Sequence, residues 1–186
     1  MKNYFLASLC IFICTGYGCS SSRNAVRSKN EESSPEIKST VSIKKKVPAK
    51  SIDVKNIEPG KLVRFAESLR GVPYKYGSNK KENGFDCSGF VYYVFNHFKI
   101  AVPRTSAEYT NAGKEVSIKN SKPGDLILFT GYNAKSKVVG HLGIVTKSTK
   151  NEFKFIHAVA GKGNGVIVSE MNSYFIPRFV KVIRVF

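Results

Sequence analysis

The sequence is poor in cysteine: it has four among 186 residues, and only Cys87 lies beyond residue 19. A single thiol cannot form a disulfide within its own domain, which excludes a disulfide-stapled fold. Long apolar runs are also missing. The run near the N-terminus, Phe5 to Cys14, has ten residues, whereas a helix that spans a bilayer needs about 20. Cys87 is therefore either a buried core residue or a reactive thiol.

The first 18 residues have the layout of a secretory signal peptide. Lys2 gives a positive start, the apolar run follows, and small residues lead to Cys19. A cysteine directly after a small residue at the cleavage point resembles a bacterial lipoprotein signal. We therefore expect residues 1–18 to be removed and Cys19 to carry lipid. The protein would then be exported and lipid-anchored through its N-terminus, at the periplasmic face of an outer membrane. Ordinary secretion is the alternative.

The remainder divides into a linker and one domain. After Cys19, residues up to 59 are rich in Ser, Lys, Glu and Asn without apolar periodicity, so residues 19–59 are expected to be a disordered linker with a lipid at its start. Residues 60–186 are apolar-rich and fit one globular domain, which we expect to be monomeric. This domain has 20 Lys and Arg against 8 Asp and Glu, a net charge of +12. The scarcity of acidic residues indicates an anionic partner. Export and the scattered lysines favour an acidic envelope polymer and argue against nucleic acid, and solubility alone is the other interpretation.

Helical patterns precede strand patterns in this domain. Apolar spacing predicts a helix over 60–71, and a second helix begins near Asp86, whose carboxylate is a good N-cap. A short helix is expected over 106–112. Short β-like runs follow at 126–130, 141–147, 153–159, 165–170 and 179–186. The order predicts an α+β fold, with N-terminal helices packed on an antiparallel sheet of about five strands arranged as a meander.

The domain has three histidines. His97 lies about 80° away from the apolar stripe that carries Cys87 on the second helix, so it is expected at the surface or rim. His141 and His157 flank a polar turn centred on Thr149. If the turn has an odd number of residues, the two histidines pair directly across the strands, with Cβ atoms about 5 Å apart.

Cys87 and the two paired histidines have three interpretations. A thiol peptidase would use one histidine to take the thiol proton and the second to orient the first. The helix start would lower the pKa of the thiol. A zinc site could use all three residues, but the close C-x-x-C or H-x-x-x-H spacings of such sites are missing. The third interpretation is unrelated core and surface roles. The residues favour the peptidase, with no metal.

Several short segments, taken in order, resemble a known family. They are GVPYKYG at 71–77, FDCSGFV at 85–91, VPRTSA at 102–107, PGDLILF at 123–129, HLGIV at 141–145 and FIHA at 155–158. The set is similar to the NlpC-type cell-wall cysteine peptidases, a bacterial branch of the papain-like group, here in a lipoprotein form. The resemblance covers essentially all of residues 60–186.

The resemblance implies a papain-like fold and an enzyme that hydrolyses peptidoglycan stem peptides. The implied scissile bond joins γ-D-glutamyl to the diamino acid, and the reaction passes through a thioester without any cofactor. Cys87 would be the nucleophile, His141 the base, and His157 the residue that orients the base. Cys87 would react as a thiolate whose pKa is lowered by the helix N-terminus and by the imidazolium of His141. Two rival functions remain: an N-acetylmuramoyl-L-alanine amidase of the same chemistry, and a non-catalytic lipoprotein that binds wall peptides.

The resemblance also implies substrate contacts. Tyr74, Asp86 and Ser88 would line the pocket for the residue before the scissile bond. One carboxylate and two hydroxyls suit an alkylammonium group, such as the free amine of an N-terminal L-Ala. Arg104 and Asp125 are expected to form a structural ion pair.

Overall fold

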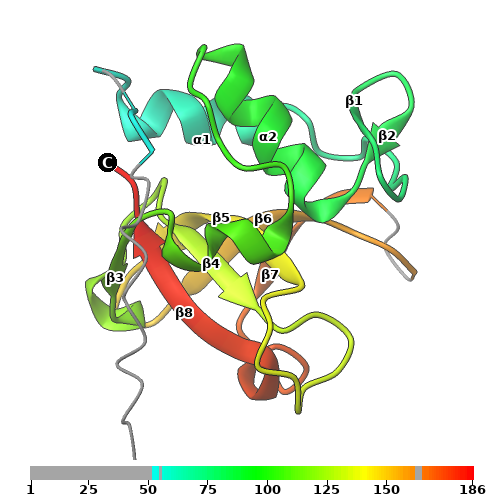
Figure 1. The fold of residues 1–186 in the computed structure, drawn as a ribbon. Helices are drawn as coiled ribbons and strands as arrows, with labels where there is room; N and C mark the ends of the chain where they lie inside the picture. The colour runs from blue at the N-terminus through cyan, green and yellow to red at the C-terminus, as the bar shows by residue number, and fades with distance from the viewer. Residues whose placement is uncertain (1–51, 55, 162–164) are drawn as a thin grey trace, which may run out of the picture. The chain divides into compact units, whose positions relative to one another are not determined.

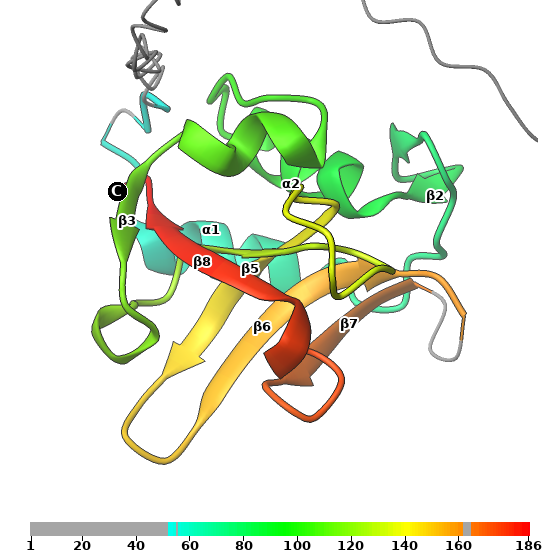
Figure 2. The same cartoon turned by 60° about the horizontal axis from the view of Figure 1, so that its bottom comes forward.

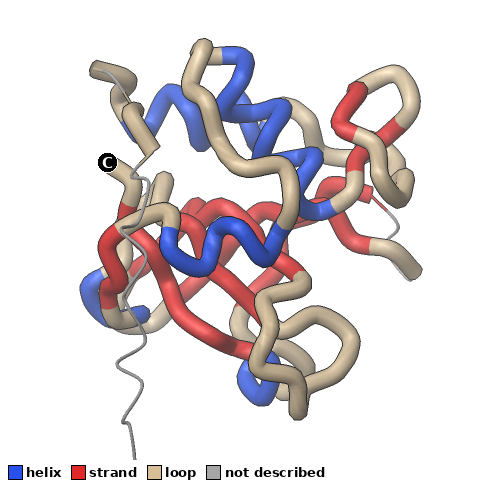
Figure 3. The backbone as a smooth tube through the Cα atoms, viewed as in Figure 1, coloured by secondary structure: helices blue, strands red, loops and turns tan. Residues whose placement is uncertain are grey.

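The computed structural model describes residues 52–54, 56–161 and 165–186. The predicted signal peptide, the lipidated Cys19 and the linker up to residue 51 lie outside the described residues. In the described part, two α-helices cover one face of a six-stranded antiparallel sheet (Figures 1 and 3). This confirms the predicted α+β class. None of the helices in these ranges is long and apolar enough to cross a bilayer.

Helix α1, Pro59–Glu67, forms where the sequence places proline at the first helical turn. Proline is tolerated there because the N–H it lacks would have no partner within the helix. The helix buries Leu62, Val63 and Ala66. It ends before the predicted limit at Gly71, whose backbone N–H instead donates to the Val166 carbonyl at 2.9 Å.

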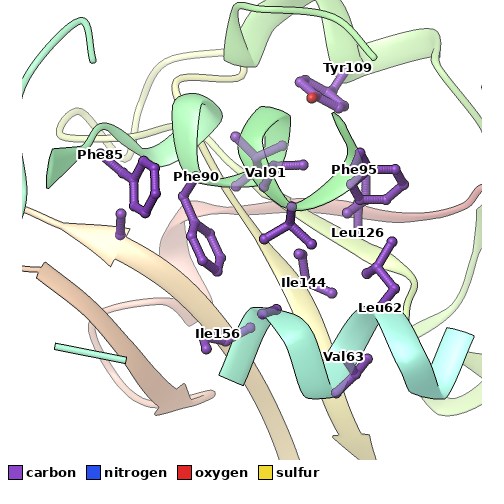
Figure 4. Packing of buried hydrophobic residues seen from close by; sticks show 14 of the residues in the cluster. Leu62, Val63, Phe85, Phe90, Val91, Phe95, Tyr109, Leu126, Ile144 and Ile156 are labelled. Atoms are coloured by element: carbon purple, nitrogen blue, oxygen red, sulfur yellow. The ribbon is translucent and has the colours of Figure 1, made fainter. Parts of the chain in front are cut away.

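Helix α2, Cys87–His97, begins at Asp86 as predicted. The Asp86 carboxylate accepts a hydrogen bond from the Gly89 backbone N–H at 2.5 Å, which caps the helix. The apolar face of α2 is fully buried against α1 and the sheet (Figure 4), and each large side chain there contributes roughly 1.5–3 kcal/mol. His97 is exposed and stacks on Phe65, in agreement with the expected surface position.

The six-stranded sheet has the order β3–β8–β4–β5–β6–β7. The predicted meander is therefore wrong in one respect, because the C-terminal strand β8 inserts between β3 and β4 (Figure 1). Figure 2 shows β8 running beside β3. Strand β3 was not predicted: it has three residues, two of them exposed, and leaves little apolar pattern to read. The strands are β3 Lys114–Val116, β4 Leu126–Phe129, β5 His141–Ser148, β6 Phe153–Val159, β7 Gly165–Glu170 and β8 Phe179–Arg184.

Short elements complete the described part. Strands β1, Asn79–Lys80, and β2, Gly84–Phe85, pair with each other beside the start of α2. The helix expected over 106–112 is a 3-10 helix, η1, over Ser106–Asn111. Two further 3-10 helices are η2, Ile118–Asn120, and η3, Ile176–Arg178.

The sheet buries a different set of side chains on each face, because successive residues of a strand point to opposite sides. The face under the helices is mainly aliphatic and includes Leu126, Ile144 and Ile156 (Figure 4). The opposite face holds what we call the aromatic cluster: Ile127, Phe129, Val145, Phe155, Phe175 and Val182.

The packed region begins earlier than Gly60. Ile52 is buried, and its backbone N–H donates to the Ala112 carbonyl at 3.4 Å. Val54 and Ile57 also pack against the core under the helices. Residues 52–58 were expected to belong to the disordered linker. The three apolar residues Ile52, Val54 and Ile57 form too weak a pattern in the sequence to reveal their own packing.

Candidate active site

Cys87 stands where α2 meets the start of β5. Its Sγ atom lies 3.4 Å from Ser106 Oγ and 3.9 Å from the Gly140 carbonyl oxygen. Gly140 immediately precedes His141, the first residue of β5. The structure therefore brings the predicted nucleophile beside the strand that carries the predicted base. The contact from Ser106 was not foreseen.

A loop crosses the helix start at very short range. An added Cβ on Gly89 would lie 2.1 Å from the Ser78 carbonyl oxygen, so only glycine fits at this position of α2. The same loop pairs with β2, since Phe85 N–H donates to the Pro73 carbonyl at 2.9 Å and Lys75 N–H to the Phe85 carbonyl at 3.0 Å. These bonds hold Tyr74, which lines the same cavity as Cys87.

The two histidines do not pair directly across the strands, so the predicted register is wrong. The prediction that both side chains lie on the same face of the sheet is confirmed. Strands β5 and β6 pair Ile144 with Ile156 and Val145 with Phe155, which shifts the register by two residues from the expected one. The causes are a four-residue loop over 149–152 and an irregularity between Val145 and Lys147. An even shift keeps both side chains on one face. The histidines thus meet diagonally, with His141 Nε2 and His157 Nδ1 2.8 Å apart.

Gly143 makes room for this diagonal contact. A Cβ at Gly143 would lie 3.2 Å from the His157 Cβ and 2.9 Å from a ring carbon of Phe155. A larger residue would therefore push the second imidazole out of place. This explains why a glycine stands between the apolar residues of β5.

The hydrogen-bond chain continues to a residue that sequence reasoning missed. His157 Nε2 lies 2.9 Å from the hydroxyl of Ser169 on β7. The strand pairing sets Ser169 opposite Phe155, again one diagonal step from the histidine. Only the register of three neighbouring strands reveals this contact. Serine on a half-buried strand gives no other signal.

The histidines lie in apolar surroundings. His157 is fully buried, with its ring centroid 4.9 Å from that of Phe155 and 5.5 Å from that of Phe175. Burial lowers the pKa of His141 to about 4. Burial, with His141 as a smaller cause, also holds the pKa of His157 well below its usual value. Both imidazoles are therefore neutral near pH 7.

The pKa of the Cys87 thiol is shifted upward, in the direction opposite to the one expected from the helix start. Burial raises the pKa of Cys87, and nearby Asp86 adds to the rise. The hydrogen bond from Ser106 and the backbone N–H groups of Ser88 and Cys87 lower the pKa, but they do not offset burial. Burial therefore opposes the expected thiolate–imidazolium pair, and it favours a neutral Cys87 thiol and a neutral His141 near pH 7.

The contacts also decide which nitrogen can accept the thiol proton. Because His141 Nε2 is bonded to His157, only Nδ1 is left for Cys87. If Nδ1 is to accept, Nε2 must carry the proton and donate it to His157 Nδ1. His157 then carries its own proton on Nε2 and donates it to Ser169 Oγ.

Asp86 and Ser88 belong to a charge-paired network behind the thiol. Arg104 donates to both carboxylate oxygens of Asp86, at 3.1 and 2.7 Å, and to Ser88 Oγ at 3.0 Å. Asp86 and Ser88 are buried and do not line the cavity that holds Cys87. Their role in substrate binding stays a prediction. The predicted pair of Arg104 with Asp125 is wrong, since Asp125 pairs with Arg184 at 2.7 Å.

A cavity of about 140 Å³ opens at the thiol. Besides Tyr74, Cys87 and His141, it is lined by three residues that sequence reasoning missed: Tyr132, Tyr174 and Arg178. These stand in the β4–β5 and β7–β8 connections, where no periodic pattern marks them. Within the described ranges, no three His, Cys, Asp or Glu residues are grouped as a metal site would require.

Comparison with known proteins agrees with this geometry. The NlpC/P60 family model matches residues 71–184. The chain is 39% identical over 127 residues to the probable peptidoglycan endopeptidase LytE of Bacillus subtilis, which covers 67% of this chain and 34% of that protein. It is 33% identical over 138 residues to the murein DD-endopeptidase MepS/murein LD-carboxypeptidase of Escherichia coli K12, which covers 73% of this chain and 65% of that protein.

Solved structures show the same fold. An NlpC/P60 family protein from Bacillus cereus matches with a TM-score of 0.62 at 23% identity, over 71% of this chain and 41% of that chain. The predicted papain-like fold is confirmed by this likeness. The chain spans less than two thirds of the length of both curated relatives.

Proposed function

We propose, from the premise that the chain belongs to the NlpC/P60 family, that it is a cysteine endopeptidase acting on peptidoglycan stem peptides. The bond cut joins γ-D-glutamyl to the diamino acid. One observation carries the proposal: Cys87, a thiol at a helix start, and His141 line one cavity, and His141 is hydrogen-bonded to a second histidine, His157. Nucleophile, base and orienting group are the parts that acyl transfer through a thiol requires.

The first step forms a tetrahedral adduct of Cys87 with the substrate. His141 Nδ1 takes the Cys87 proton as sulfur attacks the amide carbonyl, so that a C–S bond forms and the oxygen becomes an oxyanion. Proton transfer accompanies attack because the surroundings favour the neutral thiol beforehand. The backbone N–H groups of Cys87 and Ser88, which lie beside the sulfur, can donate to the oxyanion, with the Tyr74 hydroxyl on the cavity wall.

The second step releases both products. His141 returns its proton to the amide nitrogen, the C–N bond breaks, and the diamino acid leaves as an amine, while the oxyanion collapses to a carbonyl and leaves the acyl group on Cys87 as a thioester. Water then gives a proton to His141 Nδ1 as its oxygen attacks the thioester, and the proton passes to sulfur when the γ-D-glutamyl product departs as a carboxylic acid. His157 keeps the proton of His141 on Nε2 throughout, which leaves Nδ1 free to act.

A second candidate bond comes from the name of the E. coli relative, which is called a DD-endopeptidase. The same thiol and base would serve that reaction. The choice between a γ-D-glutamyl bond and a DD bond depends on which peptide fits the walls of the cavity.

Digestion of purified peptidoglycan separates these functions. We expect the full chain to release soluble peptides that begin at the diamino acid, identified by mass spectrometry, and the Cys87→Ala protein to release none. Products that end in D-Ala at a cleaved cross-link would establish the DD activity. A free L-Ala amine beside intact lactyl groups on the glycan would identify an amidase. Binding to the wall peptide without any product would refute peptidase activity.

We further propose that Cys19 carries lipid and holds the domain at the periplasmic face of an outer membrane. The support is the small-residue approach to Cys19 after an apolar run of ten residues. Globomycin, which blocks lipoprotein signal cleavage, should leave residues 1–18 attached. Cys19→Ala should abolish labelling with a fatty-acid analogue. A mature N-terminus at any residue other than Cys19 would contradict the proposal.

A further inference from the structure

Arg178 stands on the wall of the active-site cavity and belongs to no part of the thiol mechanism. It is the last residue of η3, just before β8. Of the described residues that line the cavity, it alone has a side chain that is charged near neutral pH. The remaining lining is aromatic, aliphatic or glycine, together with the neutral Cys87 and His141.

The guanidinium of Arg178 is held in one position by two loops. It donates to the Tyr174 carbonyl at 2.7 Å and to the Tyr132 carbonyl at 3.3 Å. Its Cζ atom lies 4.0 Å from the centroid of the Tyr174 ring, a stacked cation–π contact. The Arg178 carbonyl also accepts from the Thr130 N–H at 2.9 Å, which ties η3 to the end of β4. A cation fixed in this way loses little further freedom when it binds an anion.

No carboxylate compensates this charge within the described residues. Arg104 and Arg184, in contrast, each pair with a buried aspartate at 2.7 Å. Of the five N–H donors of a guanidinium, two on Arg178 reach carbonyls, and the buried Nε–H has no partner in the described part of the chain. Its positive charge is therefore available to whatever enters the cavity.

We propose that Arg178 binds a carboxylate of the stem peptide and so selects substrates that carry an ionised acid beside the scissile bond. The inference rests on the proposed function, because it assigns a specificity contact to the same cavity. Among the anionic groups that are common in a peptide, the carboxylate matches the planar guanidinium best. The two tyrosines that hold it, Tyr132 and Tyr174, are exposed and border the site with aromatic surface.

Two carboxylates of such a peptide share this chemistry. One is the α-carboxylate of the γ-linked D-Glu, on the acyl side of the bond. The other is the side-chain carboxylate of diaminopimelate, on the amine side. Neutral carboxamides of the same shape distinguish the two sources.

The test uses three L-Ala-γ-D-Glu-diaminopimelate tripeptides whose C-termini are amidated: one with both carboxylates, one with the D-Glu carboxamide, and one with the side-chain carboxamide of diaminopimelate. We expect one of the two amides to lower kcat/KM of the wild type by about 10-fold to 100-fold. Arg178→Gln should remove that preference and still cleave the amide peptide. Arg178→Lys keeps the charge but loses the planar, forked arrangement of N–H donors, so it should retain part of the preference.

The control is Arg70→Gln, which removes the same charge from an exposed position outside the cavity and should preserve the full preference. If Arg178 only braces the two loops, Arg178→Gln will slow all three peptides equally and keep the wild-type ratios, which would overturn the inference. Equal rates on all three peptides in the wild type would overturn it as well.

A binding measurement separates this inference from the proposed function. Titration of Cys87→Ala protein with the three peptides by calorimetry should show the same carboxylate preference in Kd, and Cys87→Ala/Arg178→Gln should lose it. If the wild type cleaves none of the peptides but this preference appears, the peptidase proposal fails and the carboxylate site stands. Equal Kd values for all three peptides refute the site even if cleavage occurs.

Discussion

The two sides of the candidate active site are built on opposite electrostatic principles. The thiol side is polar and charge-paired: behind Cys87, a buried carboxylate receives four hydrogen bonds, two of them from an arginine. It consists of Asp86, Cys87, Ser88, Arg104 and Ser106. The histidine side carries no formal charge near pH 7 and is packed against the aromatic cluster. It consists of His141, His157 and Ser169.

The difference shows what each side contributes. On the thiol side, the ion pair satisfies Asp86 and fixes the cap of α2, so it positions the sulfur at the first turn of the helix. On the histidine side, apolar surroundings keep the base uncharged at neutral pH, which is the form that accepts a proton. A charged group beside the two histidines, or an unpaired charge behind Cys87, would remove this difference between the two sides.

Removal of the Cys87 thiol or the His141 imidazole should have the largest effect on activity of all the changes considered. Cys87→Ala or His141→Gln should lower kcat on a tripeptide substrate by at least about 10³-fold, because in the proposed mechanism each group takes part in bond formation or proton transfer. His97→Gln is the matched control, since His97 is exposed and stacks on Phe65 away from the cavity. Residual activity of His141→Gln within tenfold of the wild type would remove His141 from the mechanism.

Breaking the ion pair should destabilise the thiol side. Arg104→Met leaves the buried Asp86 carboxylate without its cation, so the free energy of unfolding should fall by about 2–3 kcal/mol in urea titrations. Arg104→Met/Asp86→Asn should recover part of the loss, because a neutral amide can still cap α2. Arg70→Met, at an exposed position, should cost little. Equal losses in the single and double variants would show that the charge of Asp86 is not the cause.

The same network bears on the expected recognition of a free L-Ala amine by Asp86. Because Arg104 already pairs with both carboxylate oxygens, Asp86→Asn alone would leave the arginine unpaired as well as remove the anion. The amine preference is therefore measured in the double variant. If kcat/KM on free tripeptide relative to muropeptide stays at the wild-type ratio there, Asp86 is a helix cap and does not recognise the amine.

Acid should test the histidine side through stability. The pKa of His141 is about 4 in the fold and about 6.5 in an unfolded chain. Between these values the unfolded chain binds more protons, so stability falls as the pH is lowered from 6.5 to 4. A shift of this size corresponds to about 3–4 kcal/mol in full, of which about 2–3 kcal/mol is lost between about pH 7 and 4.5. Urea unfolding at about pH 7 and 4.5 should show this loss in the wild type and less of it in His141→Gln. An identical pH dependence in both proteins would refute a buried neutral base.

Thiol labelling sharpens the contrast between the two sides. Burial raises the pKa of Cys87, so iodoacetamide should modify the protein more slowly at pH 6 than it modifies an unhindered thiol. His141→Gln should change that rate little, because the neutral imidazole does not hold a thiolate. Labelling at pH 6 that is faster than for the free thiol, and that slows sharply in His141→Gln, would restore the thiolate–imidazolium pair expected from the sequence.

The sequence predicted local features well and contacts between distant segments poorly. Asp86 as helix cap, the apolar stripe of α2 and the bounds of β6 and β7 follow from periodicity and turn chemistry, which act within a few residues. The insertion of β8 and the diagonal histidine register depend on which strands become neighbours. A loop length and one irregularity at residue 146 decide the register, and neither has a distinctive composition.

The site residues divide in the same way. Cys87, His141 and His157 stand in short motifs and were predicted from the sequence, and the structure brings them together. Ser106, Ser169 and Arg178 were missed because the fold brings each of them to the site from a segment far along the chain. The partners of Arg104 and Asp125 were also misassigned, since charge alone does not reveal which acid and base meet in the fold.

The smallest expected effect belongs to Ser169, at the far end of the hydrogen-bond chain. In Ser169→Ala the Nε2–H of His157 loses its acceptor, so His157 can shift its proton to Nδ1. That proton would point at His141 Nε2 and favour the tautomer of His141 with a protonated Nδ1, which cannot take the thiol proton. We expect kcat/KM to fall by about 3-fold to 10-fold, with KM nearly unchanged. Ser169→Thr keeps the hydroxyl and should recover most of the activity.

Imidazole ¹⁵N chemical shifts measure this effect directly, because they distinguish protonated from unprotonated ring nitrogens. Wild type and Ser169→Thr should show His141 protonated on Nε2, and Ser169→Ala should show a population protonated on Nδ1. A purely structural role of Ser169 would lower the unfolding temperature without changing the tautomer. Unchanged chemical shifts together with unchanged kcat/KM in Ser169→Ala would show that the functional hydrogen-bond chain ends at His157. The orientation of the base would then depend on burial alone.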